Sequence, residues 1–238
     1  MKLDFRRAWK NIILYFNLFG SLLASNGCFL SSAQMNENMV LVPEGSFFMG
    51  YNTKNDFEWG DVDEEPVHKV FLHPYFIDRY EVSATDFSLF LNDVNNVKGY
   101  YLDNKYGILF YNGRFNPKKG FKNHPINNVS WKGAYEYCKW KEKRLPTEAE
   151  WEKAARGADG QVYPWGNRPP THDLARYNQV WTKEIKHHVM VPVNIFSEGT
   201  SPYGVYNMAG NVKEWVDDWF DREYYNDPAN HINPKGQI

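Results

Sequence analysis

The feature that most constrains the fold of this 238-residue chain is its supply of aromatic side chains between frequent turns. The chain holds 16 Phe, 16 Tyr and 9 Trp, together with 17 Gly and 13 Pro. Each buried aromatic ring removes a large apolar area from water, so few regular elements are needed to build a core. Gly and Pro indicate many turns. We therefore expect an α+β domain with little regular secondary structure, short antiparallel strands, about three helices and long structured loops.

Strands are predicted near the start of the folded region. Residues 39–43 are an apolar run, Glu44-Gly45 punctuates it, and residues 46–50 are apolar again, which predicts a hairpin. Residues 52–66 are acidic and polar, which is typical of an exposed loop. Residues 68–77 alternate and predict a further strand.

The first predicted helix begins near Ser83, which can cap it, with Asp86 in the first turn. Its buried face follows the 3.6-residue period: Phe87, Phe90, Leu91 and Val94. Residues 99–122 are rich in Tyr, Asn, Gly and Lys, and we expect loops with short strands there.

Two further helices are predicted. One begins near Ser130, and its expected inner face is Trp131, Ala134, Tyr135 and Cys138. The other begins at Thr147, which with Glu150 forms a capping box, and it ends at Gly157. Its expected inward residues are Trp151, Ala154 and Ala155.

The first 33 residues have the pattern of a targeting segment. Basic residues open it, and an apolar run over residues 11–25 follows that is short and interrupted for a membrane span. Three outcomes stay open: signal cleavage near Ala33, lipidation at Cys28, or a retained membrane anchor. Each predicts an exported domain, in the periplasm or attached to the outer envelope as a lipoprotein. Residues 34–38 are then a linker, and residues 39–238 the domain.

The charge, the cysteine content and the absence of common motifs exclude several classes of function. The formal net charge is −2, so the basic footprint of a nucleic-acid-binding protein is absent and no nucleic-acid partner is expected. Cys28 and Cys138 are the chain's two cysteines, and removal or lipidation of Cys28 leaves Cys138 without a disulfide partner. The sequence contains no phosphate loop, His-Glu-x-x-His, Cys-x-x-Cys or nucleophile elbow.

The stretch from Tyr206 to Trp219 offers oxygen atoms for a hard cation. Calcium takes six to eight oxygens from carboxylates, amides and backbone carbonyls. Asn207 and Glu214 can give side-chain oxygens, and Gly210 and Val212 can give carbonyls. Spacing alone leaves a second interpretation open, an Asn-Gly turn before a pair of buried Trp residues.

Four segments together carry a resemblance to a known family. They are residues 39–50, 76–82, 125–157 with its continuation 163–167, and 204–219. In order and spacing they resemble the formylglycine-generating (sulfatase-modifying) enzyme family. The resemblance implies a C-type-lectin-like fold stabilised by calcium.

The resemblance also implies particular metal ligands. One family calcium site matches Asn207, Gly210, Val212 and Glu214. A second would begin at Asn178 and Gln179, although residues 184–190, where its other ligands fall, hold no matching Asp.

Family enzymes oxidise a cysteine of a client sulfatase to formylglycine with dioxygen, using copper(I) held by two C-terminal cysteine thiolates. This chain has no such pair before its last residue, Ile238, so no catalytic residue can be assigned and copper is not expected. Cys138 is expected to pack as a small apolar side chain. We expect a chain that is incomplete at its C-terminus and inactive alone, with a protein client such as a sulfatase. The alternative is a non-catalytic envelope lipoprotein or binding module on the same fold.

Overall fold

The computed structural model describes residues 38–51, 62–102, 107–177, 190–221 and 223–236. Short strands, three α-helices and long loops make up this described part, as the α+β prediction requires. The strands are β1 (Met39–Val42), β2 (Gly45–Met49), β3 (His68–Leu72), β4 (Tyr75–Asp78), β5 (Ile108–Tyr111) and β6 (Arg114–Pro117). The α-helices are α2 (Ala84–Asp93), α3 (Trp131–Trp140) and α4 (Glu148–Arg156). Short 3₁₀ turns are η2 (Val62–Glu64), η3 (Ser197–Gly199), η4 (Tyr224–Asn226) and η5 (Pro228–His231).

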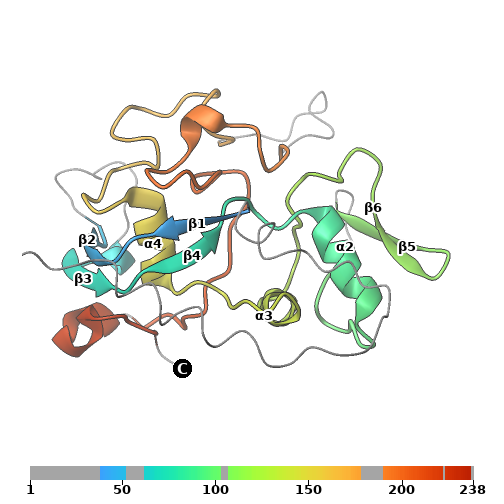
Figure 1. Ribbon diagram of the computed structural model, residues 1–238, viewed down its shortest axis with the longest axis horizontal. Coiled ribbons are helices and arrows are strands. Elements are labelled where there is room, and N and C mark those ends of the chain that lie inside the picture. The colour runs from blue at the N-terminus through green and yellow to red at the C-terminus, as the bar shows by residue number, and fades with distance from the viewer. Residues whose placement is uncertain (1–37, 52–61, 103–106, 178–189, 222, 237–238) are drawn as a thin grey trace, which may run out of the picture.

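The described strands form three antiparallel pairs (Figure 1). β1 pairs with β4, so that Val40 lies opposite Ile77, and β2 pairs with β3, so that Phe47 lies opposite Val70. The predicted hairpin over residues 39–50 is therefore wrong, because β1 and β2 take different partners. The predicted strand over residues 68–77 is two strands, one for each of them.

A helix side chain fixes the corner between β1 and β2. The Lys153 ammonium group donates to the carbonyl oxygens of Pro43 at 2.7 Å and Gly45 at 2.9 Å, and Lys153 is only 1% exposed. A buried ammonium group requires such partners. The two carbonyls therefore turn toward α4, and Gly45, with a φ of 138°, supplies the conformation that the corner needs.

The predicted boundaries of α4 are confirmed. The Thr147 hydroxyl accepts a hydrogen bond from the backbone N–H of Glu150, and the Glu150 carboxylate accepts one from the N–H of Thr147. Gly157 follows the helix with a φ of 73°. Ala154 is buried as expected, whereas Trp151 is only partly buried.

The predicted start of α2 and most of its buried face are also confirmed, although Val94 lies just after the helix and is only partly buried. The Ser83 side chain accepts a hydrogen bond from the backbone N–H of Asp86 at 3.1 Å. Phe87, Phe90 and Leu91 are each no more than 2% exposed.

The cap of α3 at Ser130 is confirmed, but the prediction of its inner face is wrong. The residues expected inside are all half-buried: Trp131, Ala134, Tyr135 and Cys138. The buried residues are Gly133 and Tyr137 instead. Tyr137 stacks on Phe87 with ring centroids 5.6 Å apart, and a Cβ at Gly133 would overlap the carbonyl of Tyr100. Aromatic residues surround this helix, so its pattern alone could not identify the packed face.

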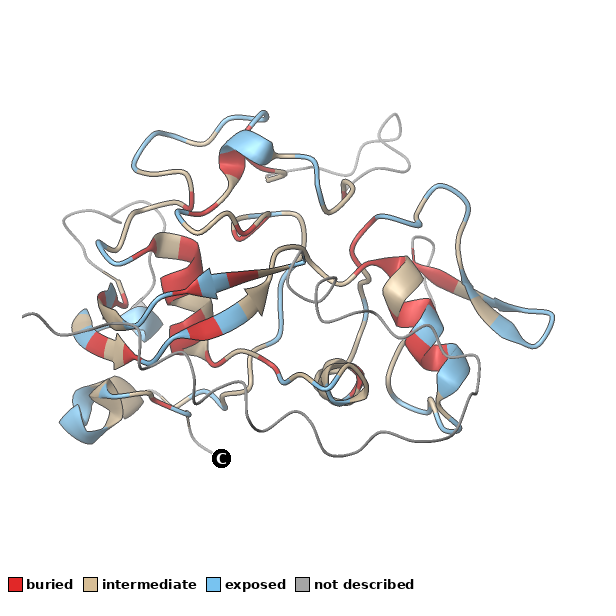
Figure 2. Cartoon of the chain, viewed as in Figure 1, coloured by how far each residue is buried: buried red, intermediate tan, exposed pale blue. Residues whose placement is uncertain are grey.

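Two hydrophobic cores organise the described residues (Figure 2). The first joins β1–β4 to α4 and to Val205 and Met208. The second joins α2, α3 and β5 through aromatic contacts, among them Phe90 and Trp140 with ring centroids 5.7 Å apart. The segments that connect the two cores position the candidate site.

Candidate metal centre and central groove

A groove of about 750 Å³ lies between the two cores, and we call it the central groove. Its walls come from β4, residues 80–82, residues 125–129, α3, residues 141–146 and residues 205–215. Phe76 and Trp215 contribute apolar surface and are 55% and 50% exposed. The Lys143 ammonium group pairs with the Asp78 carboxylate on the same wall.

The loop that holds the predicted calcium ligands has an unusual backbone. Asn207, Gly210 and Asn211 all have positive φ, at 54°, 90° and 60°. A Cβ at Gly210 would overlap the carbonyl oxygen of Arg176, so only glycine fits there. The backbone N–H of Asn211 donates to that same carbonyl at 2.8 Å. The residues of this loop therefore specify one defined backbone conformation.

The four predicted ligands lie in one loop and keep oxygen atoms available. No described residue donates a hydrogen bond to Oδ1 of Asn207 or to the carbonyls of Gly210 and Val212. The Glu214 carboxylate accepts one bond at Oε2, from the indole of Trp151 at 2.8 Å. An amide, two carbonyls and a carboxylate are the donor set that calcium prefers. The residues present therefore fit this ion.

Sequence reasoning missed two residues of this site, Glu81 and Asn211. The Glu81 carboxylate accepts hydrogen bonds from Nδ2 of Asn207 at 2.7 Å and from Nδ2 of Asn211 at 3.0 and 3.1 Å. Asn211 also binds the backbone of Val191 through both its amide oxygen and its amide nitrogen. Glu81 is 126 residues from Asn207 in the chain, so no local spacing could have linked them.

The site contains two carboxyl groups whose pKa values are raised. Burial, and then the charge of Glu214, raises the pKa of Glu81 to about 8, against the opposing effect of the two asparagine amides. Desolvation also raises the pKa of Glu214. The Glu214 side chain is exposed on the groove wall, where water screens its charge. Within the described part of the chain, no Lys or Arg pairs with either carboxylate.

The second predicted calcium site lies outside the described part of the chain. Asn178 and Gln179 lie outside the described residues, as do residues 184–189. In the part of the chain that the structure describes, no three His, Cys, Asp or Glu side chains gather in a way that could hold a metal. The candidate calcium site therefore depends on amide and carbonyl oxygens beside its carboxylates.

Cys138 does not have the properties of a copper ligand. It lies on the wall of the central groove, half-buried and without a second described cysteine. Burial, and then the charge of Asp78, raises the pKa of the Cys138 thiol to about 11. Copper(I) binds the thiolate form, which this environment disfavours. The described residues therefore do not fit a copper site.

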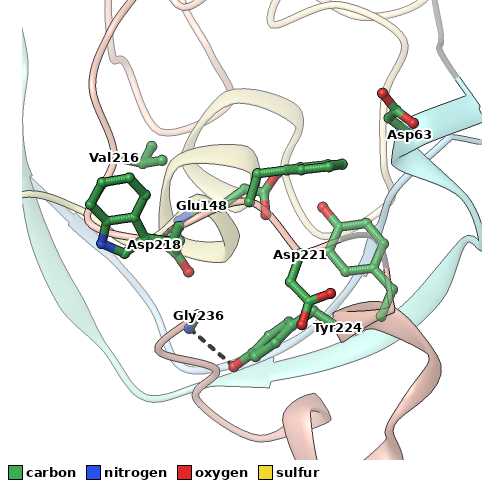
Figure 3. A pocket seen from close by; sticks show the side chains of 10 residues that line it. Asp63, Glu148, Val216, Asp218, Asp221, Tyr224 and Gly236 are labelled. Atoms are coloured by element: carbon green, nitrogen blue, oxygen red, sulfur yellow. Dashed lines mark hydrogen bonds between the residues drawn. The ribbon is translucent and has the colours of Figure 1, made fainter. Parts of the chain in front are cut away.

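A second cavity, of about 110 Å³, lies beside the N-terminus of α4 (Figure 3). The Asp218 carboxylate accepts a hydrogen bond from the backbone N–H of Glu148 at 2.7 Å. The Tyr224 hydroxyl accepts one from the backbone N–H of Gly236 at 3.0 Å, drawn as a dashed line in Figure 3. An acidic group at a helix N-terminus is stabilising. The first contact joins Asp218 to the start of α4, and the second joins Tyr224 to Gly236.

None of the described helices has the length and apolar character that a membrane span requires. The predicted targeting segment, residues 1–33, lies outside the described residues.

The fold and the site define an α+β domain in which aromatic cores, a capped helix and a carboxylate–amide network hold long loops in place. The sequence pattern of the "Sulfatase-modifying factor enzyme 1-like domain" matches residues 27–237. The chain belongs to the sulfatase-modifying factor, or formylglycine-generating enzyme, family.

Individual relatives agree with this assignment. The "Formylglycine-generating enzyme" of Thermomonospora curvata is 34% identical, over 87% of this chain and 80% of the relative. The "Inactive C-alpha-formylglycine-generating enzyme 2" of Bos taurus is also 34% identical, over 82% of this chain and 75% of the relative. Among solved structures, PvdO from Pseudomonas aeruginosa superposes with a TM-score of 0.62 at 26% identity, over 84% of this chain and 77% of that one.

Proposed function

We propose that this domain binds an extended segment of a protein client in the central groove, as an exported, calcium-stabilised member of its family. The groove is the observation that carries the proposal, since its volume of about 750 Å³ is in the range of ligand-binding sites. Its wall offers exposed apolar side chains, Phe76 and Trp215, beside the Asp78–Lys143 ion pair. Such a mixed wall suits a polypeptide, which presents apolar and polar groups in turn.

The client class that we infer is a sulfatase-type protein with a cysteine in the bound segment. Support comes from relatives named formylglycine-generating enzymes, together with one relative named inactive. The oxidation step is not assigned to this chain. Its two cysteines are Cys28 and Cys138, and Cys138 has the environment of a packed thiol.

Calcium has a structural role in this proposal. Asn207, Gly210, Val212 and Glu214 would hold it, and their loop forms one wall of the central groove. A bound ion neutralises the carboxylates and fixes a loop that has no regular secondary structure. The groove then keeps its shape before a client arrives, which reduces the entropy lost on binding.

Export and attachment follow from the N-terminal segment. We propose that residues 1–33 direct the domain across the inner membrane. Lipidation at Cys28 or a retained membrane anchor would attach the domain, whereas cleavage near Ala33 would release it. Incorporation of labelled fatty acid into the full chain, lost in Cys28→Ala, supports lipidation. A mature N-terminus near residue 34 without a lipid supports cleavage.

Client binding is tested with a labelled synthetic peptide that covers the cysteine segment of a bacterial sulfatase. We expect fluorescence anisotropy to report saturable binding to the full chain in calcium, and weaker binding to Phe76→Ala. Phe110→Ala is the matched control, because Phe110 is 63% exposed on β5 and lies outside the groove. Equal affinity of all three proteins would place the peptide elsewhere, and absence of binding to wild type would overturn the proposal.

The same peptide separates binding from turnover. Incubated with the chain, copper(I) and dioxygen, it should keep its cysteine when examined by mass spectrometry. Formation of formylglycine would overturn the binding-only role and establish the alternative, an oxidase. In that event Cys138→Ser would show whether the lone described thiol takes part.

A further inference from the structure

Glu81 lies between β4 and α2, and its carboxylate meets two asparagine side chains from a distant loop. It accepts from Asn207 at 2.7 Å and from Asn211 at 3.0 and 3.1 Å. No described residue supplies it with a cationic partner. A buried charged group costs free energy unless it is paired with a cation or coordinates a metal ion.

The hydrogen bonds of Glu81 decide which way each amide points. The Glu81 carboxyl oxygens accept hydrogen bonds from both asparagines, so each amide presents its NH₂ group to Glu81. Asn207 uses both donors in this way, one toward Glu81 and one toward the carbonyl of Val193 at 2.9 Å. Its Oδ1 is then directed away from Glu81 and accepts no bond from a described residue.

Asn211 is fixed by the same carboxylate and by the backbone of Val191. Its Nδ2 donates to Glu81 and to the Val191 carbonyl at 3.2 Å, and its Oδ1 accepts from the Val191 N–H at 2.9 Å. Glu81 therefore connects β4 and α2 to both loops that border the candidate metal centre. Replacing Glu81 should therefore change the orientation of the Asn207 and Asn211 amides.

Charge gives a second reason. Glu81 and Glu214 line the same groove, and neither carboxyl group pairs with a cationic side chain in the described part of the chain. The affinity of oxygen sites for calcium rises with the number of charges that surround the ion. Two carboxylates without a protein cation therefore favour a bound one.

We propose that Glu81 is the positioning residue of the calcium site, which turns the Asn207 amide oxygen toward the ion and adds a second negative charge beside Glu214. This inference rests on the calcium site put forward under the proposed function. Groups that orient the ligands of a metal typically change its affinity by 10- to 100-fold when they are replaced.

The test is a calorimetric titration of the full chain with calcium after treatment with EDTA and removal of the chelator. The site under test is the one that disappears in Glu214→Gln. We expect Glu81→Gln to bind calcium at that site at least about 10-fold more weakly than wild type. The reason is that a glutamine at position 81 presents a donor to one of the asparagines and lets the Asn207 amide turn over. Glu81→Asp keeps the charge but moves it, and we expect an intermediate loss.

Two further measurements separate positioning from simple packing. Glu198→Gln is the matched control, because Glu198 is exposed on η3 outside the network, and it should bind calcium as wild type does. In EDTA at pH 8, Glu81→Gln should be at least as stable as wild type, because it removes a carboxyl group that is buried without a cation. In calcium the order should reverse. A packing role would lower stability in both conditions.

The outcomes are distinct. Calcium binding by wild type that weakens in Glu81→Gln and remains in Glu198→Gln supports the inference. Undiminished affinity in Glu81→Gln and Glu81→Asp overturns it and leaves the calcium site standing. Absence of calcium binding to wild type removes the calcium site and, with it, the role of Glu81, while client binding to the groove can still be measured in EDTA.

Discussion

Glu152 and Glu81 are both carboxylates held inside the protein, but the groups around them differ. Glu152 on α4 has a side chain that is 14% exposed, pairs with Arg156 at 2.7 Å and accepts from the backbone N–H of Gly50 at 3.0 Å. Glu81 accepts from two amides and faces Glu214. Burial raises the pKa of Glu152 to about 7, against the effect of Arg156, and that of Glu81 to about 8. The first site contains its own cation, whereas we propose that a bound calcium ion completes the second.

The largest predicted effect comes from replacing Glu152, whose site contains its own cation. Glu152→Ala leaves the Arg156 guanidinium buried without its carboxylate and the N–H of Gly50 without its acceptor. Breaking a buried pair in this way costs about 3–5 kcal/mol. Urea unfolding in calcium should report that loss, whereas Glu198→Ala, on an exposed turn, should change stability by less than about 0.5 kcal/mol. A loss below 1 kcal/mol for Glu152→Ala would show that water reaches Arg156 instead.

Calcium should act on the second site and not on the first. A ligand at 100 times its dissociation constant stabilises the folded state by about 2.7 kcal/mol, so calcium should raise the free energy of unfolding by that order relative to EDTA. Glu214→Gln should abolish the gain from this site. A full calcium gain in Glu214→Gln would mean that the ion binds elsewhere.

The two sites also differ in how far the sequence could predict them. Thr147, Glu150 and Gly157 set the boundaries of α4 through contacts within a few residues, so the pattern of the sequence was sufficient. The corner at Pro43 is fixed by Lys153, 110 residues away, and the prediction of a hairpin failed there. Physical contacts between distant segments leave no periodic signal.

The residues of the candidate calcium site also differ in how far the sequence predicts them. Asn207, Gly210, Val212 and Glu214 lie in one short loop, and their chemistry together with the family resemblance predicts them as ligands. Glu81 comes from a segment 126 residues earlier than Asn207, and only the fold brings the two together. Glu81 also lies two residues before Ser83, the cap of α2. The sequence around it therefore indicated a helix start and gave no sign of the contact with Asn207.

The next effect is a pH dependence that calcium should suppress. Burial and Glu214 raise the pKa of Glu81 from its ordinary value near 4.5 to about 8 in the folded protein. Below pH 4.5 the group is protonated in both states, and the stability is fully present. As the pH rises from about 4.5 to 8 the unfolded chain ionises first, so the calcium-free protein loses stability.

Glu152 titrates in the same direction, so this dependence is measured as a difference between proteins. Thermal or urea unfolding in EDTA at pH 5 and pH 8 should show a loss in wild type that exceeds the loss in Glu81→Gln by on the order of 2 kcal/mol. Calcium should remove that difference, because it binds the ionised form. Equal losses in the two proteins would assign the titration to other groups.

The smallest effect tests whether Glu81 acts through the start of the helix that follows it. Ser83 caps α2 two residues after Glu81, and Thr147 caps α4 beside Glu152, each by accepting from a backbone N–H three residues on. Replacing either cap with Ala should cost about 1 kcal/mol in unfolding experiments, because one helix donor is left without its partner. If Glu81 acts on the ion directly through the Asn207 amide, Ser83→Ala should leave the calcium affinity unchanged, as Thr147→Ala should. If Ser83→Ala lost calcium affinity as Glu81→Gln does, the effect would come from the backbone between β4 and α2. The Glu81 carboxylate would then have no separate role in orienting the Asn207 amide.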